Sequence, residues 1–186
     1  MGEVIPLNGH VHIKAWERQD DGTEIVCYEK TIKNLIVDVG KDSILKYLGN
    51  ITGGGYANGI GVGDSTTAAG GAQTDLQASS NYLWKTISTA DRVYIRPTLY
   101  VNCDFGYSEA NFTWNEIAIR DNQGSPIMWA RQIDSSPLVK TTSKRAIVEW
   151  QLSLCPKYLY LDLTQYLQKL LSLQTLQNTS HLWMII

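Results

Sequence analysis

Between His10 and Leu154, the chain is a succession of short segments in which apolar and polar residues alternate. Successive side chains of a β-strand point to opposite faces, so this alternation buries one face of a strand and exposes the other. The pattern is plainest in HVHIKAWE (10–17) and KRAIVEWQLSL (144–154). Short strands separated by turn residues at this spacing are typical of a β-sandwich or a jelly roll.

The expected strands follow one another closely. A turn at Asp20-Asp21-Gly22 joins 10–17 to a returning strand at 24–32, which predicts a hairpin. Further strands are expected at 59–64, 81–88, 92–104, 113–120, 127–133 and 144–154.

One helix is expected, from Asp38 to Leu48, where the apolar period changes to that of a helix. Gly49-Asn50 supplies its end. The period places four apolar residues on roughly one face: Val39, Ile44, Leu45 and Leu48.

The stretch 50–80 is rich in glycine, alanine, serine and threonine. Its GIGVGD motif (59–64) predicts a short strand that other backbone approaches closely, because glycine is used where no side chain fits. Residues 65–80 predict a long ordered loop, and loops of that length in compact domains are usually functional or disordered. Small residues and few charges suit close contact between subunits, so Gly61 and Gly63 are expected at a contact with another chain.

Beyond Pro156 the chain changes character, since residues 157–186 contain three charged residues and nine leucines. Alternating spacings of four and three form an a/d seam of about two heptads. A helix of that length is not stable alone, so we expect it to join a bundle of its own copies or a groove on another protein. A helix folded back on its own domain is the alternative. The expected contact residues are Leu159, Leu163, Tyr166, Leu170, Leu173 and, in the apolar tail, Trp183.

Composition argues against several classes of partner. The formal net charge is −2 and the basic residues are dispersed, so no nucleic-acid partner is expected. No apolar run approaches the roughly eighteen residues of a membrane span, and the N-terminus lacks the features of a secretory signal. Three widely separated cysteines, Cys27, Cys103 and Cys155, predict free thiols in a reducing cytoplasm.

The sequence offers no strong catalytic motif. The GxGxG within 59–63 follows no βαβ pattern and opens no helix, so no cofactor is expected. His10 and His12 lie on one face of the expected strand and could serve as metal ligands. The favoured interpretation is that they are polar residues on the solvent-exposed face of that strand. Four scattered acids could in principle supply a glycosidase-type carboxylate pair, which nothing in their pattern supports: Asp104, Glu109, Glu116 and Asp121. We therefore expect a protein that is not an enzyme and has no metal site.

Three segments in order carry a resemblance to a known group. They are NLIVDVGKDSIL (34–45), IGVGDSTTAA (60–69) with Thr74-Asp75-Leu76, and FTWNEIAIRD (112–121) continuing to Ala130-Arg131-Gln132-Ile133. Together they resemble small β-rich structural proteins of tailed-bacteriophage virions. The resemblance covers about 34–154 and implies a β-sandwich, often trimeric, without catalysis. Such proteins decorate capsids or form parts of tail fibres and baseplates.

The resulting prediction is a mainly β protein: an antiparallel β-sandwich or jelly-roll-like domain with one short helix and a C-terminal helical or extended arm. We expect an N-terminal hairpin region (1–33), a sandwich body (34–155) and an apolar arm (156–186). The favoured function is a capsid cement or decoration protein, acting as a homotrimer on the major capsid protein or other proteins of a virion that is assembled in the host bacterial cytoplasm. A tail-fibre or baseplate adaptor and a carbohydrate-binding module with exposed Trp and Tyr are the alternatives.

Overall fold

The structure is a computed structural model that describes residues 7–95 and 97–154, so the predicted C-terminal arm lies outside the described residues. Residues Leu7–Ser153 form one compact unit. In chain order the elements are β1 (Leu7–Arg18), β2 (Glu24–Lys33), β3 (Leu35–Ile36), α1 (Asp38–Leu48), β4 (Ala57–Gly63), β5 (Tyr82–Thr86), the 3-10 helix η1 (Thr89–Asp91), β6 (Arg92–Ile95), β7 (Thr98–Phe105), β8 (Thr113–Asp121), β9 (Met128–Val139) and β10 (Lys144–Leu154).

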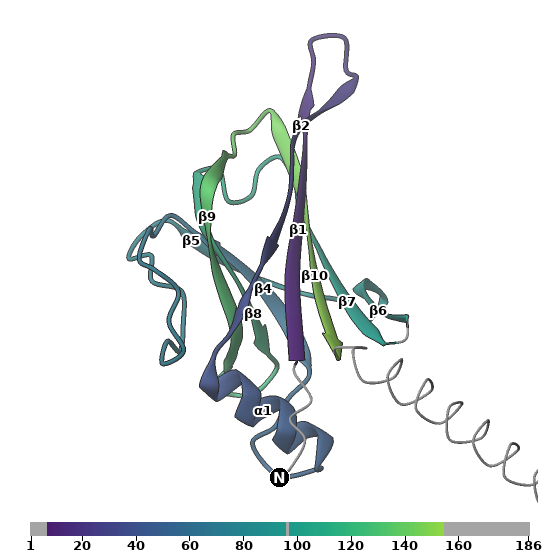
Figure 1. Cartoon of the computed structure of the whole chain (residues 1–186). Coiled ribbons are helices and arrows are strands. Elements are labelled where there is room, and N and C mark those ends of the chain that lie inside the picture. The colour runs from purple at the N-terminus through teal and green to yellow at the C-terminus, as the bar shows by residue number, and fades with distance from the viewer. Residues whose placement is uncertain (1–6, 96, 155–186) are drawn as a thin grey trace, which may run out of the picture. The chain divides into compact units, whose positions relative to one another are not determined.

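The strands form two five-stranded antiparallel sheets, which confirms the predicted sandwich (Figure 1). Sheet A has the order β2-β1-β10-β7-β6, and sheet B has the order β3-β9-β8-β4-β5. The chain passes from sheet A to sheet B at Asn34, whose backbone N–H donates to the carbonyl of Gly9 at 3.0 Å.

The core lies between the sheets and follows the predicted alternation. Val11, Ile13 and Ala15 of β1 are buried, as are alternate residues of β10. Phe105 and Trp114 meet edge to face, with ring centroids 5.0 Å apart, and so join β7 to β8. Aromatic pairs in this geometry add to the stabilisation that comes from area burial alone. The buried residues of β10 are Ala146, Val148, Trp150 and Leu152.

The β1–β2 hairpin is built into sheet A, because β1 lies between β2 and β10. Its tip extends beyond the neighbouring strands (Figure 1). The hairpin also reaches sheet B: Tyr28 and Lys30 of β2 both donate to the buried carboxylate of Asp134 on β9. Residues 7–33 therefore share the core of the body that follows them.

Helix α1 has the predicted bounds, and two of the four residues predicted for its apolar face, Val39 and Ile44, pack against the hydrophobic clusters. Gly40 and Ser43 are its buried residues, while Leu45 and Leu48 are 66% and 76% exposed. A Cβ at position 40 would meet the backbone of Trp129, so the helix lies against β9 along its smallest residues. The predicted apolar face is therefore wrong for the last turns of the helix.

Two strand predictions also change in detail. The segment 92–104 is divided into β6 and β7, which pair as a hairpin with Ile95 opposite Thr98. Pro97 occupies the turn between them, where a residue without a backbone N–H is well tolerated. Strand β9 continues past Ile133 to Val139, so that its far end pairs with the start of β8.

Candidate functional site

The outer face of sheet B, opposite the core, is covered by α1 and by the loop 64–81. Leu76 of the loop packs in a small cluster with Ala118 of β8 and Met128 of β9, separate from the main core. The backbone N–H of Asp38, at the start of α1, donates to the carbonyl of Gly71 at 2.9 Å. Sheet B is therefore buried on both faces, and the loop forms its outer layer.

Strand β4 makes room for this layer with three glycines at alternate positions, Gly59, Gly61 and Gly63, while Ile60 and Val62 point into the core. A Cβ at Gly61 would lie 2.6 Å from a ring carbon of Trp84, and one at Gly63 would collide with the carboxylate of Glu116. The prediction of close approach at these glycines is confirmed, but side chains rather than backbone make the approach.

A buried ion pair lies beneath the loop. Glu116 of β8 and Arg131 of β9 have fully buried side chains, and Nε of Arg131 donates to Oε2 of Glu116 at 2.6 Å. Charges removed from water are stable only when they are paired and their remaining hydrogen-bonding atoms are satisfied. The loop provides those additional partners.

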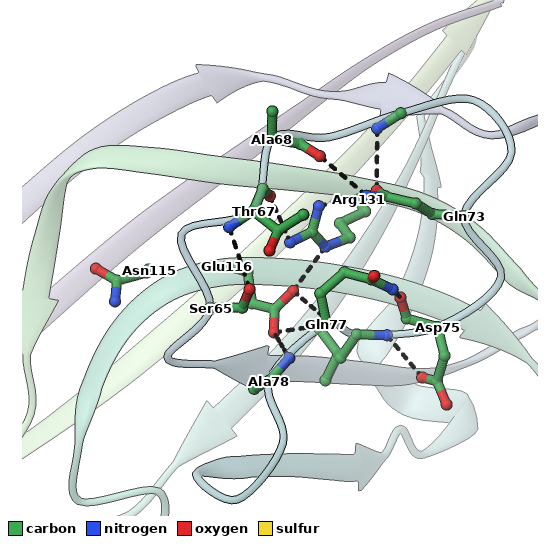
Figure 2. A network of polar contacts seen from close by, with 12 residues as sticks. Ser65, Thr67, Ala68, Gln73, Asp75, Gln77, Ala78, Asn115, Glu116 and Arg131 are labelled. Atoms are coloured by element: carbon green, nitrogen blue, oxygen red, sulfur yellow. Dashed lines mark hydrogen bonds and ion pairs between the residues drawn. The ribbon is translucent and has the colours of Figure 1, made fainter.

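Both members of the pair bind the loop backbone or its side chains (Figure 2). The Glu116 carboxylate accepts from the backbone N–H groups of Gln77, at 3.0 and 3.1 Å, and of Ala78, at 2.7 Å. Arg131 donates to the carbonyl of Thr67 at 2.9 Å and to the side-chain oxygen of Gln73 at 2.9 Å. Each charge of the pair therefore holds a different half of the loop.

Gln73 passes this restraint on to the tip of the loop. Its side-chain oxygen also accepts from the backbone N–H of Gly70 at 2.9 Å, and its amide donates to the carbonyl of Ala68 at 2.9 Å. At the base, the N–H of Asp64 donates to the carbonyl of Asn81 at 3.1 Å. A loop with close ends that is packed by its own side chains is an Ω-loop, a type that frequently carries function. The predicted long ordered loop is thus confirmed.

The loop is also held at its edge by an aromatic side chain. Trp84 of β5 donates from Nε1 to the carboxylate of Asp75 at 3.1 Å. The guanidinium of Arg120 lies over the Trp84 ring at 4.4 Å from its centroid. The guanidinium of Arg120 therefore contacts the indole of Trp84, which in turn binds the carboxylate of Asp75 in the loop.

The outward side of the loop carries small side chains, of which only Asp75 is charged. The exposed loop residues are Thr66, Thr67, Ala68, Ala72, Thr74, Asp75, Gln77, Ser79, Ser80 and Asn81. Within the part of the chain that the structure describes, no group of three metal-binding side chains comes together. The arrangement suits contact with another macromolecule, because an ordered loop with short side chains loses little entropy on binding.

The predicted contact residues fall into two groups. Gly61 and Gly63 are buried beneath the chain's own Trp84 and Glu116, so their role is to seat the loop rather than to touch a neighbouring chain. The others lie outside the described residues: Leu159, Leu163, Tyr166, Leu170, Leu173 and Trp183.

The four acids considered as catalytic carboxylates are engaged separately. Glu116 binds Arg131, and Glu109 binds Lys85 through Oε2 and Nζ at 2.6 Å. Asp121 accepts from the hydroxyl of Ser43 at 2.7 Å, while Asp104 lies near Arg145, with 3.6 Å between carboxylate and guanidinium. Each of the four is therefore engaged by a different partner.

On the outer face of sheet A, charged side chains of β1 and β2 lie in contact. His12 and Lys14 both lie beside the carboxylate of Glu29, at 3.2 and 3.0 Å. The guanidinium of Arg145 lies 4.6 Å from the centroid of the Trp16 ring. His12 is thus engaged by a carboxylate on the exposed face, as the solvent-face interpretation predicts.

A second candidate contact surface, the α1 surface, consists of the exposed apolar residues Leu45, Tyr47, Leu48, Ile51 and Tyr56. Tyr47 and Tyr56 meet edge to face at 6.4 Å. Clustered exposed apolar side chains often mark protein contact sites. No helix in the described part of the chain is long and apolar enough to cross a membrane.

Sequence reasoning did not identify the Glu116–Arg131 pair as the centre of the site. The signal was present, since Glu116 and Arg131 are charged residues within mainly apolar strand segments, NEIAI and MWARQI. A charged residue on a strand that is buried on both faces needs a partner of opposite charge. Comparison of the chain with protein-family models, curated proteins and solved structures finds no match.

Proposed function

We propose that this protein is a structural, non-enzymatic component of a tailed-phage virion, which binds the capsid lattice as an oligomer and stabilises it. The observation that carries the proposal is the loop 64–81, an ordered contact element held by the buried Glu116–Arg131 pair. The resemblance of segments 34–45, 60–69 and 112–121 to virion proteins supplies the biological setting.

The loop suits this role for an energetic reason. A lattice-binding protein makes many identical contacts, and each contact must offset the loss of conformational freedom on binding. The buried pair orders the loop when the protein folds, so the loop loses little further conformational entropy when a partner binds. Short exposed side chains such as those of Thr74 and Ser79 allow close approach of a neighbouring surface.

The α1 surface supplies the apolar part of the contact. Its exposed leucines, Leu45 and Leu48, lie on a helix that is anchored to β9 through Gly40 and Ser43. Burial of apolar area contributes about 25 cal/mol per Å², which makes a rigidly held apolar patch an effective anchor. In this proposal the loop supplies shape and the α1 surface supplies affinity for the capsid contact.

The test uses the purified full chain and capsids that lack it. We expect a trimer by sedimentation equilibrium, and a rise in the thermal stability of capsids when the protein is added. Thr74→Arg, at an exposed loop position, should abolish capsid binding, whereas Ser125→Arg, at an exposed position of the β8–β9 turn, should bind normally. A monomer that binds no capsid would contradict the proposal.

Immunogold labelling of intact virions separates the head from the tail. Label on the head is the expected result. Label confined to the tail would contradict the capsid proposal and would support the alternative, a tail-fibre or baseplate adaptor.

A further inference from the structure

Lys140 is a buried cation without a carboxylate partner among the described residues. It directly follows β9 and is only 1% exposed. Arg131 is paired with Glu116 and Asp134 with Lys30, while the buried carboxylate of Asp121 accepts hydrogen bonds from Ser43 and Ile127. An ammonium group buried without an anion is costly, and proteins avoid the cost by neutralising such a group. The placement of Lys140 therefore calls for a chemical explanation.

The Lys140 amine is held against two oxygens near the start of β8. Nζ donates to the carbonyl of Gly106 at 2.7 Å and to the side-chain carbonyl of Asn111 at 3.1 Å. Burial lowers the pKa of Lys140. A buried amine with a lowered pKa is more readily a neutral nucleophile, and here an amide carbonyl lies within hydrogen-bonding distance.

We propose that Lys140 and Asn111 become joined by an intramolecular isopeptide bond after the chain folds. The neutral Nζ attacks Cγ of Asn111, a new Nζ–Cγ bond forms, and the Cγ–Nδ2 bond breaks. One proton passes from Nζ to Nδ2, which leaves as ammonia. The reaction exchanges one amide for another, so it needs neither an oxidant nor a reductant.

Glu109 is the group that carries the proton. Its Oε2 accepts from the backbone N–H of Gly106 at 2.7 Å, so it binds the same residue whose carbonyl holds Lys140. The hydrogen bond from Lys85 lowers the pKa of Glu109 and keeps it ionised, so Glu109 relays the proton between the two nitrogens and does not retain it. Among the charged groups that act on Lys140, the carboxylate of Glu109 has the largest effect; it raises the pKa of Lys140, but the lowering by burial is larger.

The leaving group has a path to solvent. Asn111 is exposed, and its Nδ2 donates to the carbonyl of Tyr107 at 3.0 Å, which directs it away from the amine. The new bond would join the chain where β8 begins and β9 ends, since Thr113 pairs with Val139 and the N–H of Lys140 donates to the carbonyl of Phe112. A covalent link there closes the loop between positions 111 and 140 and restricts the unfolded chain.

Mass spectrometry of the purified full chain tests the proposal directly. We expect an intact mass below the sequence mass by one ammonia. After tryptic digestion, we expect one branched species that contains both Asn111 and an uncleaved Lys140, because trypsin does not cut after an acylated lysine. Asn8-Gly9 and Asn58-Gly59 can also lose ammonia by forming succinimides, so the branched peptide, rather than the mass alone, is the criterion.

Variants identify the two residues. Lys140→Arg and Asn111→Ala should each have their full sequence mass, whereas Lys144→Arg, which alters a neighbouring lysine outside the cluster, should still lose ammonia. Recovery from the wild-type chain of a tryptic peptide that ends at a cleaved Lys140, together with an unmodified Asn111 peptide, would overturn the proposal. That outcome needs no variant to fold, and it is independent of the proposed function.

Discussion

Arg131 and Glu116 meet on the outer face of sheet B with 2.6 Å between Nε and Oε2, and both side chains are fully buried. Five further hydrogen bonds connect this pair to four residues of the loop 64–81. The pair thus has two separable effects, one on the stability of the sandwich and one on the order of the loop.

Replacing one member of the pair should be severely destabilising. Glu116→Ala leaves a buried guanidinium without its anion, for which we expect a loss of about 3–5 kcal/mol in the free energy of unfolding. Urea denaturation measures the loss. Glu29→Gln, in the exposed pair with Lys14, should cost less than about 1 kcal/mol. Equal losses in both variants would show that the buried pair has no special weight.

Replacing both members should separate stability from order. In Glu116→Leu/Arg131→Met no charge remains buried, so we expect much of the lost stability to return. The anchors of Gln77 and Ala78 are still missing, so thermolysin should cut within 65–80 faster than in the wild type. A double variant with wild-type resistance to thermolysin would show that other contacts hold the loop.

Gly61 should tolerate no side chain. A Cβ there would lie 2.6 Å from the Trp84 ring, and forcing the two apart should cost Gly61→Ala about 1–3 kcal/mol. Gly124 is the matched control, because a Cβ at that position meets nothing within 4 Å. Thermal denaturation should show a lower Tm for Gly61→Ala and little change for Gly124→Ala. The reverse order would contradict the packing described for β4.

The two described cysteines should differ in reactivity. Burial raises the pKa of Cys103 to about 12, so at pH 8 hardly any thiolate is present there, and the thiolate is the reactive form. In a Cys155→Ser variant, Ellman's reagent should label the exposed Cys27 first, and Cys103 only as the chain unfolds. Labelling of both thiols at similar rates in native buffer would show that the β7 side of the core opens readily.

The α1 surface should be dispensable for folding. Leu45 and Leu48 are largely exposed, so Leu45→Lys and Leu48→Lys should change the free energy of unfolding by no more than about 0.5 kcal/mol. Both should weaken self-association or capsid binding, measured by sedimentation and by co-purification with capsids. A variant that unfolds would show that these side chains belong to the core.

The strand pattern of sheet A was accessible from the sequence because that sheet has one wet face. In β1, Val11, Ile13 and Ala15 are buried while His12 and Lys14 are not, which is the alternation that the sequence displays. Such a pattern identifies both the element and its inner face.

Sheet B gave weaker signals because its central strands are buried on both faces. In β8, Glu116 shares the outer face with Ala118, so its charge marks a covered polar site rather than a wet surface. Periodicity cannot show which residues cover a face, and the loop that does so has no periodic pattern. The same limit explains α1, where small residues rather than leucines meet the sheet, because the approach of Trp129 leaves no room for larger ones.

In the loop 64–81, the residues that hold the loop in place and the residues that face the solvent are different, which determines where its sequence can vary. The residues that hold it, Gln73 and Leu76 among them, differ from those it displays, such as Thr66, Thr74 and Ser79. The exposed positions can therefore be substituted while the residues that hold the loop are kept, as in antibodies, where variable loops are carried by a constant framework. We therefore expect substitutions at positions such as Thr66, Thr74 and Ser79 to change what the loop binds with little effect on the free energy of unfolding.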